Sequence, residues 1–156
     1  MKINICFGNS NEYLNGYINT NFIKNDKFET CHPENIDIIV DDGEADEILA
    51  INVLNYIEFN KIKDVVTNWY KKLKYDGTIT ICFFDFVEIC RALTTDQLSF
   101  SDAKKLIYGE QNEGWQFFKS GLSLVELKNF FTSINSKIEY CKRDGFISYI
   151  KIRRVK

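Results

Sequence analysis

The stretch that decides the fold runs from residue 60 to residue 85 and reads NKIKDVVTNWYKKLKYDGTITICFFD. Its apolar residues recur at i, i+3, i+4, i+7, i+8 and i+11, which is the pattern of one helix face. They are Ile62, Val65, Val66, Trp69, Tyr70 and Leu73. We expect this helix to end at Asp76-Gly77, because glycine can take the left-handed conformation that closes a helix. Residues 78–84 then read as a buried strand ended by Asp85, and such a helix–strand unit is typical of an α/β fold.

Four apolar runs upstream of this unit read as strands: residues 2–6, 17–23, 36–40 and 47–51. Only ten residues separate the first two runs, too few for the helical crossover of about a dozen residues that joins parallel neighbours. The polar segment 25–34 carries the only proline and reads as a loop. The link 41–46 spans at most about 20 Å when extended. If the third and fourth strands lie on opposite sides of the first, the third strand must be displaced, frayed or absent.

The second half of the chain continues with helices and ends in two strands. Asp85 can cap a helix over residues 86–93. The spacing Ser123-Leu-Val-Glu126 is that of a capping box, which predicts a further helix beginning there. The other expected elements are a short helix over 101–108, an aromatic-bearing loop over 109–121, and strands over 137–142 and 146–155 around the hairpin turn Asp144-Gly145. Together, these expected elements predict a mostly parallel α/β sheet with an antiparallel end.

Composition limits the classes of function. The chain has 156 residues, is 45% hydrophobic and carries a formal net charge of −2, so we expect one packed domain over residues 1–156. The sequence carries no strong nucleic-acid signal, because basic residues cluster only at the C-terminus, Lys151 to Lys156. No apolar run approaches the roughly 18 residues of a membrane span, so no membrane partner is expected.

Cysteine and histidine usage points to a reduced setting without metal. The five cysteines are scattered without a C-x-x-C pair, and His32 is the only histidine, so a zinc site is not expected. Met1 leads directly into a strand pattern and not into the apolar core of a signal peptide. A cytoplasmic location is therefore the expectation.

Several segments, in order, resemble the compact class I S-adenosylmethionine-dependent methyltransferases. That branch reads approximately as apolar-N-apolar-G-C/S-G, G-W-x-N-V-D, V-L-E-H, W-x-x-x-L-K-P-G-G and P-D-F. The corresponding segments here are Asn4-Ile-Cys-Phe-Gly8, Gly16-Tyr-Ile-Asn19-Thr-Asn21, Val53-Leu-Asn-Tyr56, Trp69-Tyr-Lys-Lys-Leu-Lys-Tyr-Asp-Gly77 and Phe84-Asp-Phe86. The resemblance implies a mostly parallel, Rossmann-like methyltransferase sheet, reduced on its N-terminal side and ending in an antiparallel hairpin.

The resemblance also implies positions for S-adenosylmethionine. The loop Cys6, Phe7, Gly8 and Asn9 would hold the methionine part, with Gly8 allowing close backbone approach. Asn21 stands where the family has an acidic residue that binds the ribose, and an amide lacks the strength of a carboxylate. The remaining implied contacts are Asp41 and Asp42 for the adenine, with an ordinary turn as the alternative, and Asn52 after the fourth strand.

Catalysis would need positioning of an acceptor more than acid–base chemistry. Asp85, at the end of a strand that borders the cleft, is the candidate catalytic residue, and a helix cap is its alternative role. The first hypothesis is therefore methyl transfer to a small molecule or to an accessible group on a macromolecule. The alternatives are a catalytically inactive methyltransferase-like binding or assembly module, and a different nucleotide ligand in the same cleft. A homodimer is a possible assembly, since missing helices would leave apolar edges exposed.

Overall fold

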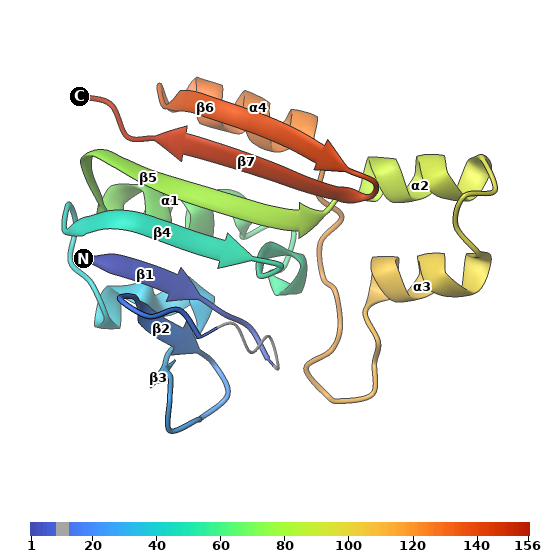
Figure 1. Ribbon diagram of the computed structural model, residues 1–156, viewed down its shortest axis with the longest axis horizontal. Coiled ribbons are helices and arrows are strands. Elements are labelled where there is room, and N and C mark those ends of the chain that lie inside the picture. The colour runs from blue at the N-terminus through green and yellow to red at the C-terminus, as the bar shows by residue number, and fades with distance from the viewer. Residues whose placement is uncertain (9–12) are drawn as a thin grey trace.

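The computed structural model describes residues 1–8 and 13–156. Their strands form one seven-stranded sheet (Figure 1). The strands are β1 (Lys2–Ile5), β2 (Ile18–Asn21), β3 (Glu29–Thr30), β4 (Ala45–Ile51), β5 (Leu73–Phe84), β6 (Lys137–Asp144) and β7 (Ile147–Arg153). Their order is β3-β2-β1-β4-β5-β7-β6. The first five in this order run parallel to one another, and β7 runs antiparallel to both β5 and β6. The predicted parallel sheet with an antiparallel end is confirmed.

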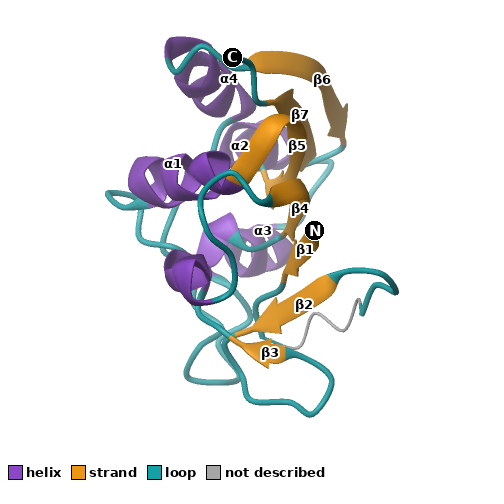
Figure 2. Ribbon diagram, turned by 90° about the vertical axis from the view of Figure 1, so that its left-hand side faces the viewer, coloured by secondary structure: helices purple, strands orange, loops and turns teal. Residues whose placement is uncertain are grey.

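The helices lie on one face of this sheet and beyond one of its ends. They are η1 (Pro33–Ile38), η2 (Leu54–Tyr56), α1 (Ile62–Lys72), α2 (Phe86–Thr94), α3 (Phe100–Tyr108) and α4 (Leu124–Ser133). Figure 2 shows α1 and α4 on the same side of the strands, and Figure 1 shows α2 and α3 projecting beyond the end of β5. Among the described residues no helix lies on the opposite face, where Leu49, Thr80 and Tyr149 are partly exposed.

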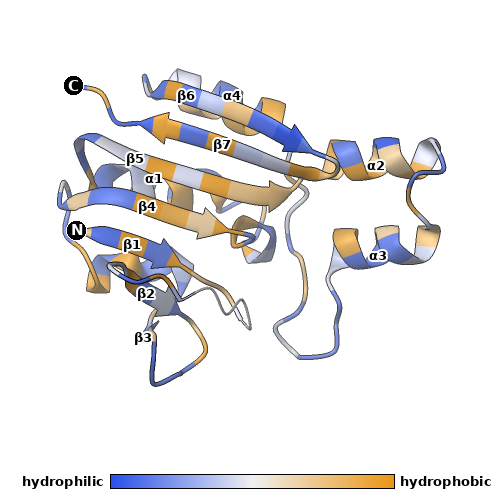
Figure 3. Cartoon of the chain, viewed as in Figure 1, coloured by the Kyte–Doolittle hydropathy of each residue, from blue (hydrophilic) through white to orange (hydrophobic). Residues whose placement is uncertain are grey.

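The core lies between the sheet and these helices. Rows of isoleucine run across the central strands in register, for example Ile3, Ile48, Ile79 and Ile152, all completely buried. Val66 and Trp69 of α1 pack into the same core, as the helical spacing predicts. The edge strand β6 is exposed along most of its length, and Figure 3 shows it hydrophilic toward its end. Charged edge strands resist pairing with other chains.

The third strand is displaced from its predicted position. The prediction of a strand over residues 36–40 is wrong, because most of that segment belongs to the 3₁₀ helix η1. Two local features start η1: the His32 side chain caps it, and Pro33 occupies its first turn, where a missing N–H costs nothing. The Pro33 carbonyl also accepts a hydrogen bond from Trp69 Nε1 at 2.8 Å, which ties η1 to α1. The observed third strand is β3, inside the segment predicted to be a loop.

Two predicted helix ends are also corrected. The left-handed residue after α1 is Asp76, with φ of 66°, and not Gly77; α1 ends earlier and β5 begins at Leu73. Position 77 needs a glycine for a steric reason instead, because the Cβ of any other residue would lie 2.9 Å from the Ala45 carbonyl oxygen. The capping box at Ser123 does not form, because its side chain accepts no capping hydrogen bond. The cap of α2 by Asp85 is confirmed.

Candidate functional site

The carboxyl ends of β1, β2 and β4 meet at one edge of the sheet, where open α/β sheets bind their ligands. The residues that follow these strands include most of the predicted cofactor positions. Cys6, Phe7 and Gly8 follow β1, Asn21 ends β2, and Asn52 follows β4. Asn9 lies outside the described residues. Each of the described positions has a defined local role in the structure.

An aromatic cluster fills this edge of the sheet. We define it as Phe7, Phe22, His32, Tyr56, Trp115 and Phe118. The Phe7 ring is stacked between two others, with centroid distances of 4.1 Å to Phe22 and 4.3 Å to Tyr56. The centroid of the Trp115 ring lies 5.9 Å from the ring centroids of both Phe22 and Tyr56. Trp115 comes from the loop between α3 and α4, so residues distant in sequence close the edge together.

Trp115 also lies directly on Gly8. The backbone of Gly8 has φ of 73°, the left-handed region that favours glycine. A Cβ added to Gly8 would lie 2.1 Å from Cζ3 of the Trp115 ring. The space beside Gly8, which a cofactor would need, is therefore occupied by the indole.

Asn21 holds the Gly8 turn from the other side. Its Nδ2 donates to the Gly8 carbonyl at 2.6 Å, and its Oδ1 accepts from the Gly8 and Ile23 amides at 3.1 Å each. The residue is only 4% exposed. The side-chain amide thus both donates to and accepts from the backbone, in an arrangement that a carboxylate could not reproduce because it has no donor.

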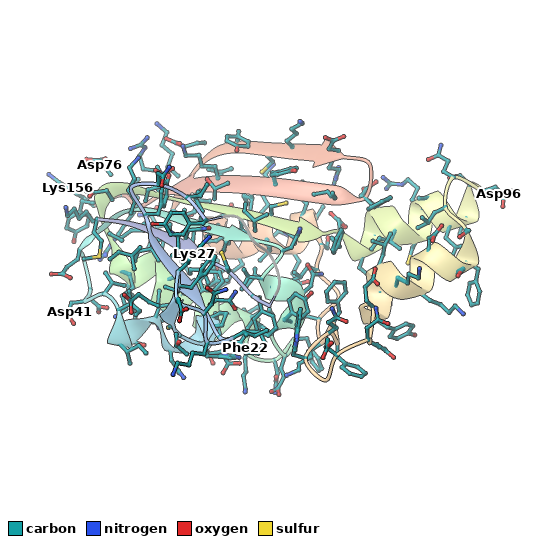
Figure 4. All side chains as sticks on the ribbon, turned by 60° about the horizontal axis from the view of Figure 1, so that its bottom comes forward. Phe22, Lys27, Asp41, Asp76, Asp96 and Lys156 are labelled. Carbon is teal, nitrogen blue, oxygen red and sulfur yellow. The ribbon has the colours of Figure 1, made fainter. Side chains whose placement is uncertain are left out.

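The other predicted contacts are placed as follows. Cys6 is buried, and its amide donates to the Thr20 carbonyl. Asn52 takes a left-handed conformation with φ of 55°, and its backbone N–H donates to the Cys82 carbonyl at 2.8 Å. Asp41 and Asp42 lie before β4, at the opposite edge of the sheet, and Figure 4 shows Asp41 far from Phe22. Asp42 is paired with Lys72 at 2.6 Å. The structure does not bring these two carboxylates together with the Gly8 turn.

Asp85 is a buried structural junction. Its Oδ1 accepts from the amides of Val87 and Glu88, at the start of α2. Its Oδ2 accepts from the Leu124 amide at 3.1 Å, at the start of α4, and from the Ser148 hydroxyl of β7 at 2.8 Å. One carboxylate therefore joins two helices and a strand, which supports the capping role. Catalysis by Asp85 stays a prediction.

His32 gives the site a titratable member. Its ring packs edge-on against Phe7 and Phe22, and burial lowers the pKa of the imidazole. The folded state therefore disfavours the protonated ring. The stability contributed by neutral His32 is complete above the unfolded pKa of about 6.5 and is lost as the pH falls through the lower folded pKa.

We accordingly expect the thermal unfolding midpoint to decrease as the pH is lowered from 7.5 to 5. Because His32 is the only histidine, His32→Asn should flatten this dependence while keeping a good cap for η1. Differential scanning fluorimetry across this pH range tests the prediction. An unchanged slope in the variant would assign the effect to another group.

Sequence reasoning missed the cluster as a unit. The loop residues Trp115 and Phe118 are apparent in the sequence, and so is Tyr56 at the end of the segment Val53-Leu-Asn-Tyr56. Nothing in their spacing predicts that they meet Phe7. The useful signal is the aromatic-rich segment 115–118 inside a loop, since large rings in a loop need a surface to cover. Within the described residues no group of three or more His, Cys, Asp or Glu side chains could hold a metal ion.

Comparison with known proteins identifies the fold. No protein-family model matches the chain, and no curated protein sequence matches it either. A solved S-adenosylmethionine-dependent methyltransferase of Methanosarcina mazei matches 99% of this chain and 92% of its own, at 12% identity and a TM-score of 0.65. A 1,6-didemethyltoxoflavin-N1-methyltransferase of Burkholderia thailandensis, with bound S-adenosylhomocysteine, matches 90% of this chain, at 12% identity and a TM-score of 0.59.

An O-methyltransferase family protein of Burkholderia thailandensis matches 83% of this chain, at 14% identity and a TM-score of 0.57. This chain spans 63% of the toxoflavin enzyme and 36% of the O-methyltransferase family protein. These identities show the fold alone: the chain has the class I methyltransferase-like fold. In the part of the chain that the structure describes, every helix is too short or too polar to cross a lipid bilayer.

S-adenosylmethionine does not fit the site as its side chains are arranged here. The indole of Trp115 covers Gly8, and Oδ1 of Asn21 already accepts hydrogen bonds from two backbone amides. No step of methyl transfer can be derived from this arrangement. A bound cofactor would require the Trp115 ring to lie elsewhere.

Proposed function

We propose that the chain binds S-adenosylmethionine at the carboxyl edge of β1, β2 and β4 when Trp115 has left Gly8, and transfers its methyl group to a small molecule or an accessible macromolecular group. The observation that carries the proposal is the Gly8 turn. It follows β1 in a class I sheet order, and a loop side chain covers its open side. The cofactor would supply an electrophilic methyl group. The chain would supply the positioning surface.

A second function is favoured by how the other polar groups are used. Asn21 is committed to the Gly8 backbone and Asp85 to two helix ends, so the described hydrogen bonds already engage the acceptors of both side chains. The sheet face opposite α1 and α4 also lacks helices among the described residues. These features suit a catalytically inactive binding or assembly module that retains the methyltransferase fold.

Calorimetric titration of the purified chain separates the two functions. Saturable binding of S-adenosylmethionine and S-adenosylhomocysteine, with micromolar dissociation constants, supports methyl transfer. The absence of both heat and thermal stabilisation at millimolar ligand overturns it and supports the inactive module. A ligand present at 100 times its dissociation constant should stabilise the fold by about 2.7 kcal/mol, which a thermal shift detects easily.

A further inference from the structure

Trp115 is carried by a loop whose hydrogen bonds are largely its own. Gln116 organises the loop: its amide donates to Glu113 O at 3.0 Å, and its Oε1 accepts from the amides of Asn112 and Glu113. The carbonyl of Gln116 accepts from the Gln111 amide at 3.1 Å. The loop therefore has an internal structure that does not depend on the position of the Trp115 ring.

The attachment of this loop to the sheet begins just after it. The Lys119 amide donates to Asn55 O at 2.7 Å, and the Ser120 hydroxyl donates to Leu54 O at 2.8 Å. Before Lys119, the described contacts of the loop with the sheet side of the site are made by two rings. Trp115 contacts Phe7, Phe22 and Tyr56, and Phe118 contacts Tyr56 and Phe84 of β5. Moving Trp115 would thus break ring packing but would leave the loop's hydrogen bonds intact.

The other cluster members cannot leave as easily. Phe7 and Phe22 directly follow β1 and β2, and Phe7 is stacked between Phe22 and Tyr56. Displacing Phe7 would disturb two ring stacks and the strand end that carries it. Trp115 is carried by the loop and not by a strand end, and its ring lies outside the Phe22–Phe7–Tyr56 stack.

We infer that Trp115 is an intramolecular occupant of the cofactor site, and that its indole covers Gly8 in the empty protein and sets the affinity for the cofactor. The inference rests on the proposed function. If the open state is only a fraction of the population, the apparent dissociation constant is the intrinsic one divided by that fraction. Removing the indole removes the competing state, so cofactor binding becomes tighter.

The test is titration of S-adenosylhomocysteine into three forms of the full chain: wild type, Trp115→Ala and Phe117→Ala. Trp115→Ala should bind at least about tenfold more tightly than wild type. Phe117 is the matched control, because it lies on the same loop, is 43% exposed and is outside the aromatic cluster. Its replacement should leave the affinity unchanged. If Trp115→Ala fails to fold by circular dichroism, Trp115→Phe replaces it and should show a smaller gain.

A second readout uses the wild-type chain alone. The chain has two tryptophans, and Trp69 is completely buried. Saturating S-adenosylhomocysteine should therefore increase acrylamide quenching of tryptophan fluorescence, because Trp115 becomes more exposed. Equal or weaker binding by Trp115→Ala, or unchanged quenching on saturation, overturns the role of Trp115 while the proposed function stands. Absence of binding in every form, at millimolar ligand, overturns the proposed function as well.

Discussion

Asp85→Ala is expected to lower the free energy of unfolding by about 3–5 kcal/mol, because it leaves several buried hydrogen-bond donors without their acceptor. The carboxylate accepts four hydrogen bonds from groups on α2, α4 and β7. Loss of the α2 cap alone typically costs about 1 kcal/mol. The Leu124 amide and the Ser148 hydroxyl would also lose a buried partner, at about 1–3 kcal/mol each before the structure relaxes.

Urea denaturation monitored by circular dichroism measures this loss. Glu126→Ala is the matched control: it also removes a carboxylate near the start of α4, but the capping box to which Glu126 would belong does not form. It should change stability by less than about 0.5 kcal/mol. If Asp85→Ala stayed within about 1 kcal/mol of wild type yet abolished a measured methyl transfer, the capping account would fail and the catalytic prediction would gain support.

The predictable part of the fold is the part coded by local periodicity. The isoleucine-rich strands and the Val65, Val66 and Trp69 face of α1 follow directly from spacing, and each is where the pattern indicates. The third strand was not predictable in this way. Residues 36–40 have the composition of a strand, but Pro33 and the hydrogen bond from Trp69 hold the segment in a helical turn. Tertiary contacts there override local preference.

In the candidate site, too, local features could be predicted from the sequence and long-range contacts could not. A turn glycine after the first strand is visible in the sequence, and its left-handed conformation agrees with that interpretation. What Gly8 meets is not visible, because Trp115 is more than 100 residues away along the chain. The same holds for Asp85, whose cap to α2 is local, whereas its bonds to Leu124 and Ser148 depend on the complete sheet.

Gly8→Ala is expected to destabilise the fold by about 2–4 kcal/mol, through two separable effects. A left-handed φ costs a non-glycine residue about 1 kcal/mol. The new methyl group would also overlap the Trp115 ring, 2.1 Å away, and force it off the turn. Overpacking of this kind typically costs about 1–3 kcal/mol.

A double-mutant cycle with Trp115→Ala separates these effects. Without the indole, Gly8→Ala should cost only the backbone part, about 1 kcal/mol. Gly43→Ala is the control for that part, because Gly43 has φ of 77° and a Cβ added there would meet no described atom within 4 Å. If Gly8→Ala cost no more than Gly43→Ala in the wild-type background, Trp115 would not rest on Gly8 in solution. If Gly8→Ala is less destabilising in the Trp115→Ala background than in the wild type, the indole lies on the turn in solution. There it excludes any ligand that needs the same surface.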